Sequence, residues 1–419
     1  MATSTAAQAP PCRFCGAPLV HDFVDLGLSP LCQTHVEEHQ LGEPEEFFPL
    51  RVRVCERCFL VQLAESVAPQ RIFGEYAYFS SYVDALVESA RAHCEAMVKR
   101  LGLGRASRVV EIASNDGYAL QHYAARGIPV LGVEPAANVA AAARERGVPT
   151  LVRFFGRDTA REVVASHGRA DFVFGNNVLA HVPALDDFVA GLALLLAPRG
   201  TLTMEFPHVA ALIEGNQFDT IYHEHFSYFS FTTAERVFAA HGLRVFDVEE
   251  IPLHGGSLRV HVCHDGDGAQ PTGARVAALR AREREAGLGS LETYAGFAER
   301  VRATKRDLLA LLIEVKRRGR RVAAYGAAGK AVTLLNYCGI RTDFVDYCVD
   351  RNPYKQGKYL AGVRIPIHPP ERLRQTRPDY VLILPWNLRE EIVRHTAYVR
   401  DWGGRWIVPI PHAEVIEEP

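Results

Sequence analysis

Apolar and polar positions recur along the chain in a pattern that predicts a strand–turn–helix unit in its middle third. Apolar strands are expected at residues 108–112 and 129–133, and each is followed by a small polar turn and an amphipathic helical pattern. Further strands are expected at residues 151–154, 171–174 and 201–206. This β-α-β-α-β order is typical of a doubly wound sheet.

A second unit of the same kind is expected further along the chain. It follows a charged stretch, residues 271–321, whose pattern is helical with a break at residues 287–289. A strand, a glycine turn and a helix then occupy RVAAYGAAGKAVTLLNYCG, and DYVLILP supplies a later strand. The chain is therefore expected to contain two related sheets.

Two CxxC pairs precede these units. Cys12 and Cys15 form the first pair, and Cys55 and Cys58 form the second. Two such turns place four thiolates around one ion, as in structural zinc sites, and in a reducing compartment they favour metal over disulfides. Free thiols and a redox CxxC are the alternatives. We expect structural Zn²⁺ and an ordered insert between the pairs.

The expected fold class is therefore α/β: a small zinc-binding N-terminal domain followed by two Rossmann-like doubly wound α/β domains. The expected domain bounds are 1–72, 73–272 and 273–419. Of the 419 residues, 48% are hydrophobic and 23% charged, and the formal net charge of −2 argues against a nucleic-acid partner. No apolar run has the length of a membrane span, and no signal peptide is evident, so a cytoplasmic protein without a membrane partner is expected.

The strand ends of the first unit carry polar side chains suited to a nucleoside cofactor. A carboxylate at Glu134, where the second strand ends, suits the two hydroxyls of a ribose. The first turn, EIASNDG, lacks GxGxxG, and its polar side chains favour cationic S-adenosylmethionine (SAM) over NAD; a plain helix cap is the alternative. The expected cofactor-binding residues are Glu111, Asn115, Asp116, Gly117, Glu134, Pro135, Asn176, Asn177 and Val178.

Proton-handling side chains gather in TIYHEHFSYFS, residues 220–230. Histidine is the side chain whose unperturbed pKa, about 6.5, suits a general base near neutral pH. Residues two apart share a face of an extended segment, so spacing alone leaves both His223 and His225 open as the base. A structural role for these histidines is the alternative.

The glycine turn of the second unit, GAAGKA, matches neither a P-loop nor GxGxxG. Gly326 and Gly329 still allow a tight turn into a helix N-terminus, which attracts phosphate oxygens, and Lys330 adds a positive charge. Asp350 occupies the place of a ribose ligand and leaves an NAD site possible. The tract HGGS at residues 254–257 either presents a backbone amide to substrate or connects a hairpin.

Taken in order, the motifs CxxC…CxxC, YAYFSSY, EIASNDG, GNNVLAHV, YHEHFSYFS and YGAAGKA resemble the sugar C-methyltransferases of deoxysugar and antibiotic biosynthesis. The resemblance covers nearly the whole chain. It implies a zinc-binding domain, a SAM-binding domain and a C-terminal domain for a nucleotide sugar. It also implies methyl transfer from SAM to C3 of a dTDP-linked 3-amino-4-keto-2,3,6-trideoxysugar.

The resemblance further assigns roles to single residues. It implies that His225 is the base at C3, and that Tyr222 and Glu224 hydrogen-bond the sugar or its oxyanion. It brings His181 to the substrate from the fourth strand and Tyr76 from the segment after the zinc domain. The implied nucleotide-sugar contacts are Lys330, Thr333 and Asn336. A monomer is expected; the alternative functions are an NAD-dependent nucleotide-sugar oxidoreductase and a non-enzymatic zinc-ribbon binding protein.

Overall fold

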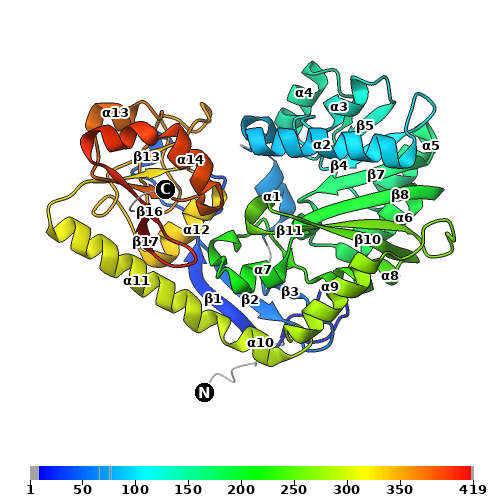
Figure 1. The fold of residues 1–419 in the computed structure, drawn as a ribbon, viewed down its shortest axis with the longest axis horizontal. Coiled ribbons are helices and arrows are strands. Elements are labelled where there is room, and N and C mark those ends of the chain that lie inside the picture. Colours follow the sequence, from blue (N-terminus) through cyan, green and yellow to red (C-terminus); the bar gives the residue numbers. More distant parts are fainter. Residues whose placement is uncertain (1–8, 66, 75, 77, 417–419) are drawn as a thin grey trace.

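The computed structural model describes residues 9–65, 67–74, 76 and 78–416. Two α/β lobes stand on either side of Figure 1, and a smaller sheet from the N-terminal part of the chain lies below and between them. The middle lobe is built on a seven-stranded sheet, the C-terminal lobe on a six-stranded sheet, and the N-terminal sheet has four strands. The predicted α/β class with two Rossmann-like lobes is confirmed.

The sheet of the middle lobe has the strand order β10-β11-β8-β7-β4-β5-β6. Strands β8, β7, β4, β5 and β6 are parallel to one another, whereas β11 runs antiparallel to β8 and β10 runs antiparallel to β11. The predicted strands are present, although β6 has only two residues. Side chains of α2 and α3 cover one face, and α5, α6, α8 and α9 cover the other. The strands are β4 Val109–Ile112, β5 Val130–Val133, β6 Thr150–Leu151, β7 Ala170–Asn176, β8 Leu196–Pro207, β10 Leu243–Ile251 and β11 Ser257–His264.

The helices of this lobe follow the predicted alternation with the strands. They are α2 Asp84–Leu101, α3 Leu120–Ala124, α4 Ala137–Glu145, α5 Arg157–His167, α6 Leu185–Leu195, α7 Val209–Glu214, α8 Phe231–Ala239 and α9 Ala274–Glu285. Short 3₁₀ turns lie between them at η2 Ser80–Tyr82, η3 Leu179–His181, η4 Phe218–Thr220 and η5 Leu253–Gly255. No helix in the described part of the chain combines the length and the apolar character needed to cross a membrane.

The N-terminal sheet has the order β1-β2-β3-β9. Its first two strands come from the insert between the cysteine pairs, and the third follows the second pair. The prediction that the insert is ordered is therefore confirmed. The fourth strand, β9, belongs to the histidine-rich segment more than 160 residues later and pairs antiparallel with β3. The elements are β1 His21–Ser29, η1 Glu38–Gln40, β2 Phe48–Val54, β3 Val61–Leu63, α1 Pro69–Phe73 and β9 Ser227–Tyr228.

The C-terminal lobe has the strand order β14-β13-β12-β15-β16-β17, parallel except for β17. The predicted helix break at residues 287–289 separates α9 from the next helices. The helices are α10 Leu291–Ala295, α11 Phe297–Arg317, α12 Gly329–Cys338, α13 Arg372–Thr376, α14 Arg389–His395, η6 Trp386–Leu388 and η7 Ala397–Trp402. The strands are β12 Val322–Tyr325, β13 Cys348–Val349, β14 Ile367–His368, β15 Tyr380–Ile383, β16 Arg405–Val408 and β17 Glu414–Ile416.

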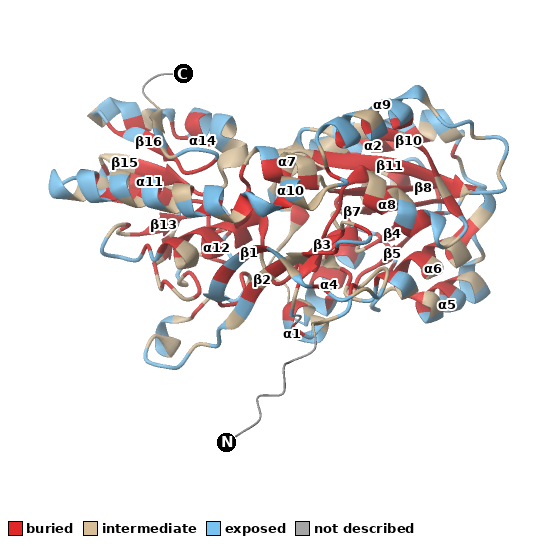
Figure 2. Cartoon of the chain, turned by 90° about the horizontal axis from the view of Figure 1, so that it is seen from below, coloured by how far each residue is buried: buried red, intermediate tan, exposed pale blue. Residues whose placement is uncertain are grey.

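One continuous apolar core joins the N-terminal sheet to the C-terminal lobe, and it includes side chains of residues 209–228. Phe23 of β1 stacks on Phe297 of α11, with ring centroids 4.3 Å apart. Buried positions run through the strands of all three sheets in Figure 2. The N-terminal sheet therefore shares its core with the C-terminal lobe and does not form a separate globular unit.

Candidate functional site

A cavity of about 600 Å³ lies where the carboxyl ends of the strands of both lobes face each other. Its lining comes from the turns after β4, β5 and β7 on one side and from those after β12, β13 and β15 on the other. Residues 220–225 contribute a third wall. Ligands of doubly wound folds bind at this end of the strands, and the volume suits a small-molecule site.

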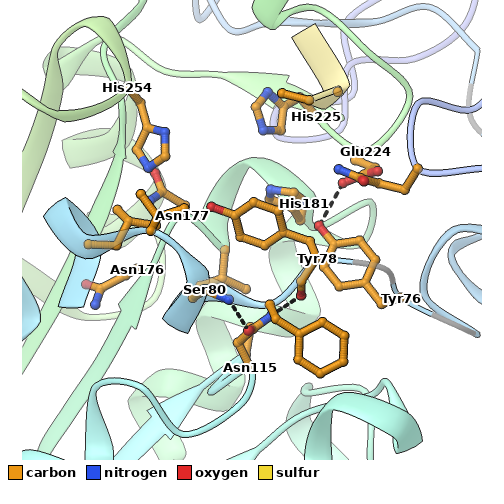
Figure 3. Close-up of a pocket in the computed structure, with 18 of the residues that line it drawn as sticks. Tyr76, Tyr78, Ser80, Asn115, Asn176, Asn177, His181, Glu224, His225 and His254 are labelled. Carbon is orange, nitrogen blue, oxygen red and sulfur yellow. Dashed lines mark hydrogen bonds between the residues drawn. The ribbon is translucent and has the colours of Figure 1, made fainter. Parts of the chain in front are cut away.

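On the middle-lobe side, a carboxylate is fixed at the end of β5. Glu134 accepts hydrogen bonds from the backbone amides of Asn115 and Ala136, both at 2.9 Å. Asn115, whose φ of 48° is in the left-handed region, accepts from the Ser80 amide at 2.9 Å and donates to the Tyr78 carbonyl at 3.1 Å (Figure 3). These bonds tie the segment after the N-terminal sheet across the cofactor turn.

The end of β7 presents amides to the same wall. The Nδ2 of Asn176 donates to the Tyr118 hydroxyl at 3.3 Å, and Asn177 has a left-handed φ of 56°. The Oδ1 of Asn177 is buried without a hydrogen-bond partner among the described residues. Pro135 and Val178 also line the cavity. An unpaired buried acceptor beside a cavity is a group that a ligand can satisfy.

Glu111, Asp116 and Gly117, which we expected to contact the cofactor, lie behind the cavity wall instead. Asp116 pairs with Arg146 at 2.7 Å, and Gly117 adopts a φ of 77° with Val148 close by. Glu111 is fully buried, and burial raises the pKa of its carboxyl well above the usual range. The side chains of Glu111 and Asp116 are fully buried behind the wall, and all three residues shape the turn.

The charge of the cavity wall on this side depends on Glu134. Burial raises the pKa of its carboxyl to about 7, against the opposing effect of the two backbone donors. A cation bound beside this group favours the ionised form. The turn therefore fits SAM, whose positive charge and ribose hydroxyls both suit a carboxylate at this place.

The histidine-rich segment is a turn, not the extended segment assumed from sequence. The amide of His225 donates to the Tyr222 carbonyl at 2.9 Å, which reverses the chain between them. His225 consequently lines the cavity, whereas His223 lies outside it and donates from Nε2 to the Pro49 carbonyl at 3.1 Å. The turn separates the two histidines that spacing alone could not distinguish.

The tautomer of His225 follows from its contact. Its Nδ1 lies 2.8 Å from the Thr220 carbonyl, which can only accept, so Nδ1 carries the proton and Nε2 carries a lone pair. Burial, aided by His181, lowers the pKa of this imidazole well below its usual range, so it is neutral. The His181 ring lies 4.7 Å away and the Tyr222 ring 4.1 Å away, centroid to centroid. The segment therefore presents an unprotonated nitrogen in the cavity.

Glu224 joins three parts of the chain. Its Oε2 accepts from the Tyr76 hydroxyl at 2.9 Å, as Figure 3 shows, and its Oε1 accepts from the Cys32 thiol at 3.1 Å. Burial raises the pKa of Glu224 to about 6 and that of Tyr76 well above its usual range, so the phenol stays a donor. Sequence analysis missed Cys32, because a lone cysteine in the zinc insert carries no signal that it meets a residue 192 positions away.

In the C-terminal lobe, one of the three expected nucleotide-sugar contacts lines the cavity. Lys330 donates to Asn387 at 2.8 Å and lies over the Trp386 ring, 4.7 Å from its centroid. Thr333 is outside the lining and donates to the Ile221 carbonyl at 2.8 Å; Asn336 is also outside and donates to two backbone carbonyls of its own lobe. Both face the packed side of α12, so Thr333 anchors the histidine-rich segment.

The glycine turn between β12 and α12 is as tight as its sequence predicts. Gly326 has a φ of 94°, and a Cβ there would lie 2.5 Å from Pro385. Asp350 lines the cavity, but its two oxygens accept from the amides of Ala327 and Asn352, both at 2.8 Å. Two backbone amides therefore hold this carboxylate in the same way as that of Glu134, and the nearby Lys355, at 3.7 Å, adds positive charge beside it.

The two cysteine knuckles meet as expected. Ligand atoms of Cys12, Cys15, Cys55 and Cys58 all lie within 4.8 Å of one another, and two of the S–S distances are 3.5 Å. A tetrahedral Zn²⁺ with bonds of about 2.3 Å requires sulfurs about 3.8 Å apart. The four sulfurs therefore fit one zinc ion after small adjustments, because the 3.5 Å pairs must widen and wider pairs must close.

Known families match the chain in three successive parts. The matching descriptions are a zinc binding domain for residues 12–73, a methyltransferase domain for residues 86–248 and a C-methyltransferase C-terminal domain for residues 252–411. These matches agree with the cysteine site, the SAM-type wall and the C-terminal lobe. The protein thus carries the zinc and SAM sites of this kind of enzyme.

A curated relative spans the full architecture. The chain is 39% identical to the C-methyltransferase NovU of Streptomyces niveus, over 97% of this chain and 96% of NovU. Among solved structures, the magnesium protoporphyrin IX methyltransferase of Synechocystis PCC 6803 with bound SAH matches 46% of this chain and 91% of its own, at 13% identity and a TM-score of 0.35. The chain belongs to the C-methyltransferase family that includes NovU, and it is a SAM-dependent C-methyltransferase.

Proposed function

We propose that the enzyme methylates C3 of a dTDP-linked 3-amino-4-keto-2,3,6-trideoxysugar, with His225 as the base. The observation that carries the proposal is the neutral imidazole of His225, whose Nε2 lone pair stands in the cavity. On one side lies the middle-lobe wall that holds Glu134, called the SAM wall here. On the other side lies the C-terminal wall that holds Lys330 and Lys355, called the lysine wall. A C–H bond next to a ketone is acidic enough for a base to break when the resulting oxyanion is stabilised.

In the proposed reaction, Nε2 of His225 takes the proton from C3, and the electron pair of the C–H bond moves onto the ketone oxygen as an enolate. SAM, when bound, supplies the electrophilic methyl group. The enolate electron pair would form the new C–C bond at C3 as the methyl–sulfur bond breaks and S-adenosylhomocysteine leaves. The oxygen becomes a ketone again, and the proton leaves His225 to water. The Thr220 carbonyl stabilises the imidazolium through Nδ1–H, 2.8 Å away.

The neighbours of His225 support this role. His181 and Tyr222 pack against its ring, and Tyr222 keeps its phenol proton because burial raises its pKa well above the usual range. A protonated phenol in the cavity can hydrogen-bond the sugar. Glu224 and Tyr76 form a hydrogen-bonded pair that suits the polar substituent at C3.

The C-terminal lobe supports an anionic substrate. Lys330, Arg351 and Lys355 line the cavity wall opposite Glu134, where Asp350 lies 3.7 Å from Lys355 and Glu391 lies 3.8 Å from Arg351. Lysine and arginine are the side chains that proteins use to bind phosphate groups. We propose Lys330 as the nucleotide-sugar contact, with Thr333 and Asn336 supporting the helix that carries it.

The test is mass spectrometry of the enzyme with SAM and dTDP-3-amino-4-keto-2,3,6-trideoxyglucose in heavy water. We expect a methylated sugar nucleotide and, without SAM, deuterium at C3. His225→Asn should abolish both while SAM still binds, and His223→Asn, two residues away but outside the cavity, should retain both. Unchanged turnover in His225→Asn overturns the base assignment; SAM binding with no change to this sugar overturns the substrate.

A further inference from the structure

The turn between β10 and β11 holds a histidine that the proposed reaction does not yet use. His254, in η5, has φ 56° and ψ 19°, which is the left-handed region. Non-glycine residues occupy this region at a cost in free energy, and such strain persists where the surroundings enforce it, often at functional sites. Two glycines follow, Gly255 and Gly256, either of which accepts positive φ without strain.

The surroundings do enforce the conformation. The Gln217 side chain donates to the Gly255 carbonyl at 2.7 Å, and the His208 amide donates to the Gly256 carbonyl at 3.0 Å. A Cβ at Gly255 would lie 2.6 Å from Trp386 of the C-terminal lobe, so the turn is packed between the lobes.

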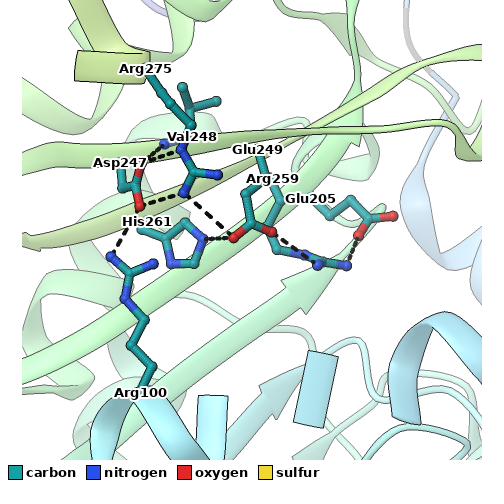
Figure 4. Close-up of polar contacts among 8 residues, drawn as sticks. All are labelled: Arg100, Glu205, Asp247, Val248, Glu249, Arg259, His261 and Arg275. Carbon is teal, nitrogen blue, oxygen red and sulfur yellow. Dashed lines mark hydrogen bonds and ion pairs between the residues drawn. The ribbon is translucent and has the colours of Figure 1, made fainter. Parts of the chain in front are cut away.

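A chain of buried charges fixes the hairpin below this turn (Figure 4). Arg259 of β11 pairs with Glu205 of β8 at 2.5 Å and with Glu249 of β10 at 3.5 Å. His261 reaches the same Glu249 at 3.2 Å. These contacts join three adjacent strands below the turn.

The side chain of His254 enters the cavity with its hydrogen-bonding capacity unused. It lines the same cavity as His181 and His225 (Figure 3). Lys330 lines this cavity too. Neither ring nitrogen bonds to a described residue; Nε2 has no accessible surface, so Nδ1 is the nitrogen that a ligand can reach. Burial, with Lys330 and His181, lowers the pKa of this imidazole to about 4, so it is neutral. A buried polar group without a protein partner is costly unless a ligand satisfies it.

We propose that the neutral imidazole of His254 donates a ring N–H to the ketone oxygen of the substrate and to the enolate oxygen that forms there. The inference rests on the proposed function, in which C3 of the sugar lies at His225 and Lys330 contacts the nucleotide sugar. His254 adds a fixed donor in a water-poor cavity, where such a donor stabilises the developing oxyanion more than the ketone. The strained backbone is then the means of aiming the ring at that oxygen.

His254→Asn and His254→Gly test this, because both residues accept left-handed φ readily. Removing one oxyanion donor lowers kcat by about 100-fold or more in comparable sites. We expect that loss for both C3 deuterium exchange and methylation, with SAM binding unchanged and Tm unchanged or raised. His167→Asn, at an exposed position of α5, is the matched control.

Each outcome decides between the two ideas. If the wild-type enzyme exchanges deuterium at C3 and both variants do so equally fast, the role of His254 is overturned and the proposed function stands. A parallel fall of Tm and activity in both variants makes His254 structural and also overturns its role. No exchange or methylation by the wild-type enzyme overturns the proposed function, and the His254 assignment with it.

Discussion

The two lobes begin with the same strand–turn–helix arrangement but present opposite charge to one cavity. In the middle lobe, the strand end holds Glu134, which two backbone amides orient toward the cavity. In the C-terminal lobe, two backbone amides hold Asp350 in the same way, but Lys330 and Lys355 also line the wall and add positive charge. One topology can therefore serve a cationic or an anionic ligand, because the turn side chains set the charge.

Removing zinc should have the largest effect, because the zinc-binding segment supports the histidine-rich segment that lies between the two lobes. The zinc knuckle ends in β3, which pairs with β9 next to His225. Loss of the metal unfolds small zinc domains, and a 1 Å displacement of a catalytic group costs about 100-fold in rate. Cys55→Ser, or chelation of the metal, should lower methylation by at least that factor.

The zinc prediction is measured by metal content and turnover, with SAM affinity as the internal control. SAM should still bind within a few-fold, because Glu134 and its partners belong to the middle lobe. Adding Zn²⁺ back to the chelated enzyme should restore turnover. Full activity at a zinc content far below one per chain contradicts the prediction.

Glu134→Gln should have the next largest effect, on the cationic side alone. A hydrogen bond to a charged group contributes about 1.5–3 kcal/mol, so SAM affinity should fall by about 10- to 100-fold. Calorimetric titration of SAM measures the loss, and Glu145→Gln, exposed at the end of α4, is the control. An equal loss of nucleotide-sugar affinity would show that the two walls do not act separately.

Lys330→Gln should have the converse effect on the anionic side. Its charge faces the cavity, supported by Asn387 and the Trp386 ring. We expect about tenfold weaker binding of the nucleotide sugar, with SAM affinity unchanged. Lys99→Gln, exposed at the end of α2, should change neither affinity. A variant that loses SAM and keeps the sugar would reverse the assignment of the walls.

The pH dependence of SAM binding should give the smallest effect. Burial raises the pKa of Glu134 to about 7, so this carboxyl becomes neutral as pH falls through 7 in the free enzyme. SAM prefers the ionised form, so its affinity should fall by about threefold from pH 7.5 to 6.5. Titration of SAM at several pH values measures this fall, and Glu134→Gln should abolish it. A fall that persists in that variant belongs to another group.

The predictable parts of the molecule were those encoded locally. The apolar runs around Val109–Ile112 and Val130–Val133 identified their strands, and the spacing of the cysteines identified the knuckles. Glu134 was found because strand ends meet at one edge of a parallel sheet.

The remainder depends on contacts between distant segments. Cys32 meets Glu224, and β9 pairs with β3, through packing that no local pattern records. Thr333 was expected in the cavity, but the helix face it occupies is set by packing against Ile221. The two histidines of the segment were separated only by a turn that sequence did not reveal.

The pairing of β9 with β3 has a consequence for the order in which the site is made. Synthesis runs from the N-terminus, so β3 has left the ribosome before the histidine-rich segment emerges. That segment meets a partner strand already present, and Arg13, between the two cysteines of the first pair, donates to the Phe226 carbonyl at 3.1 Å. The lysine wall is made last, so a nascent chain can assemble its cofactor half before the half that receives the sugar exists.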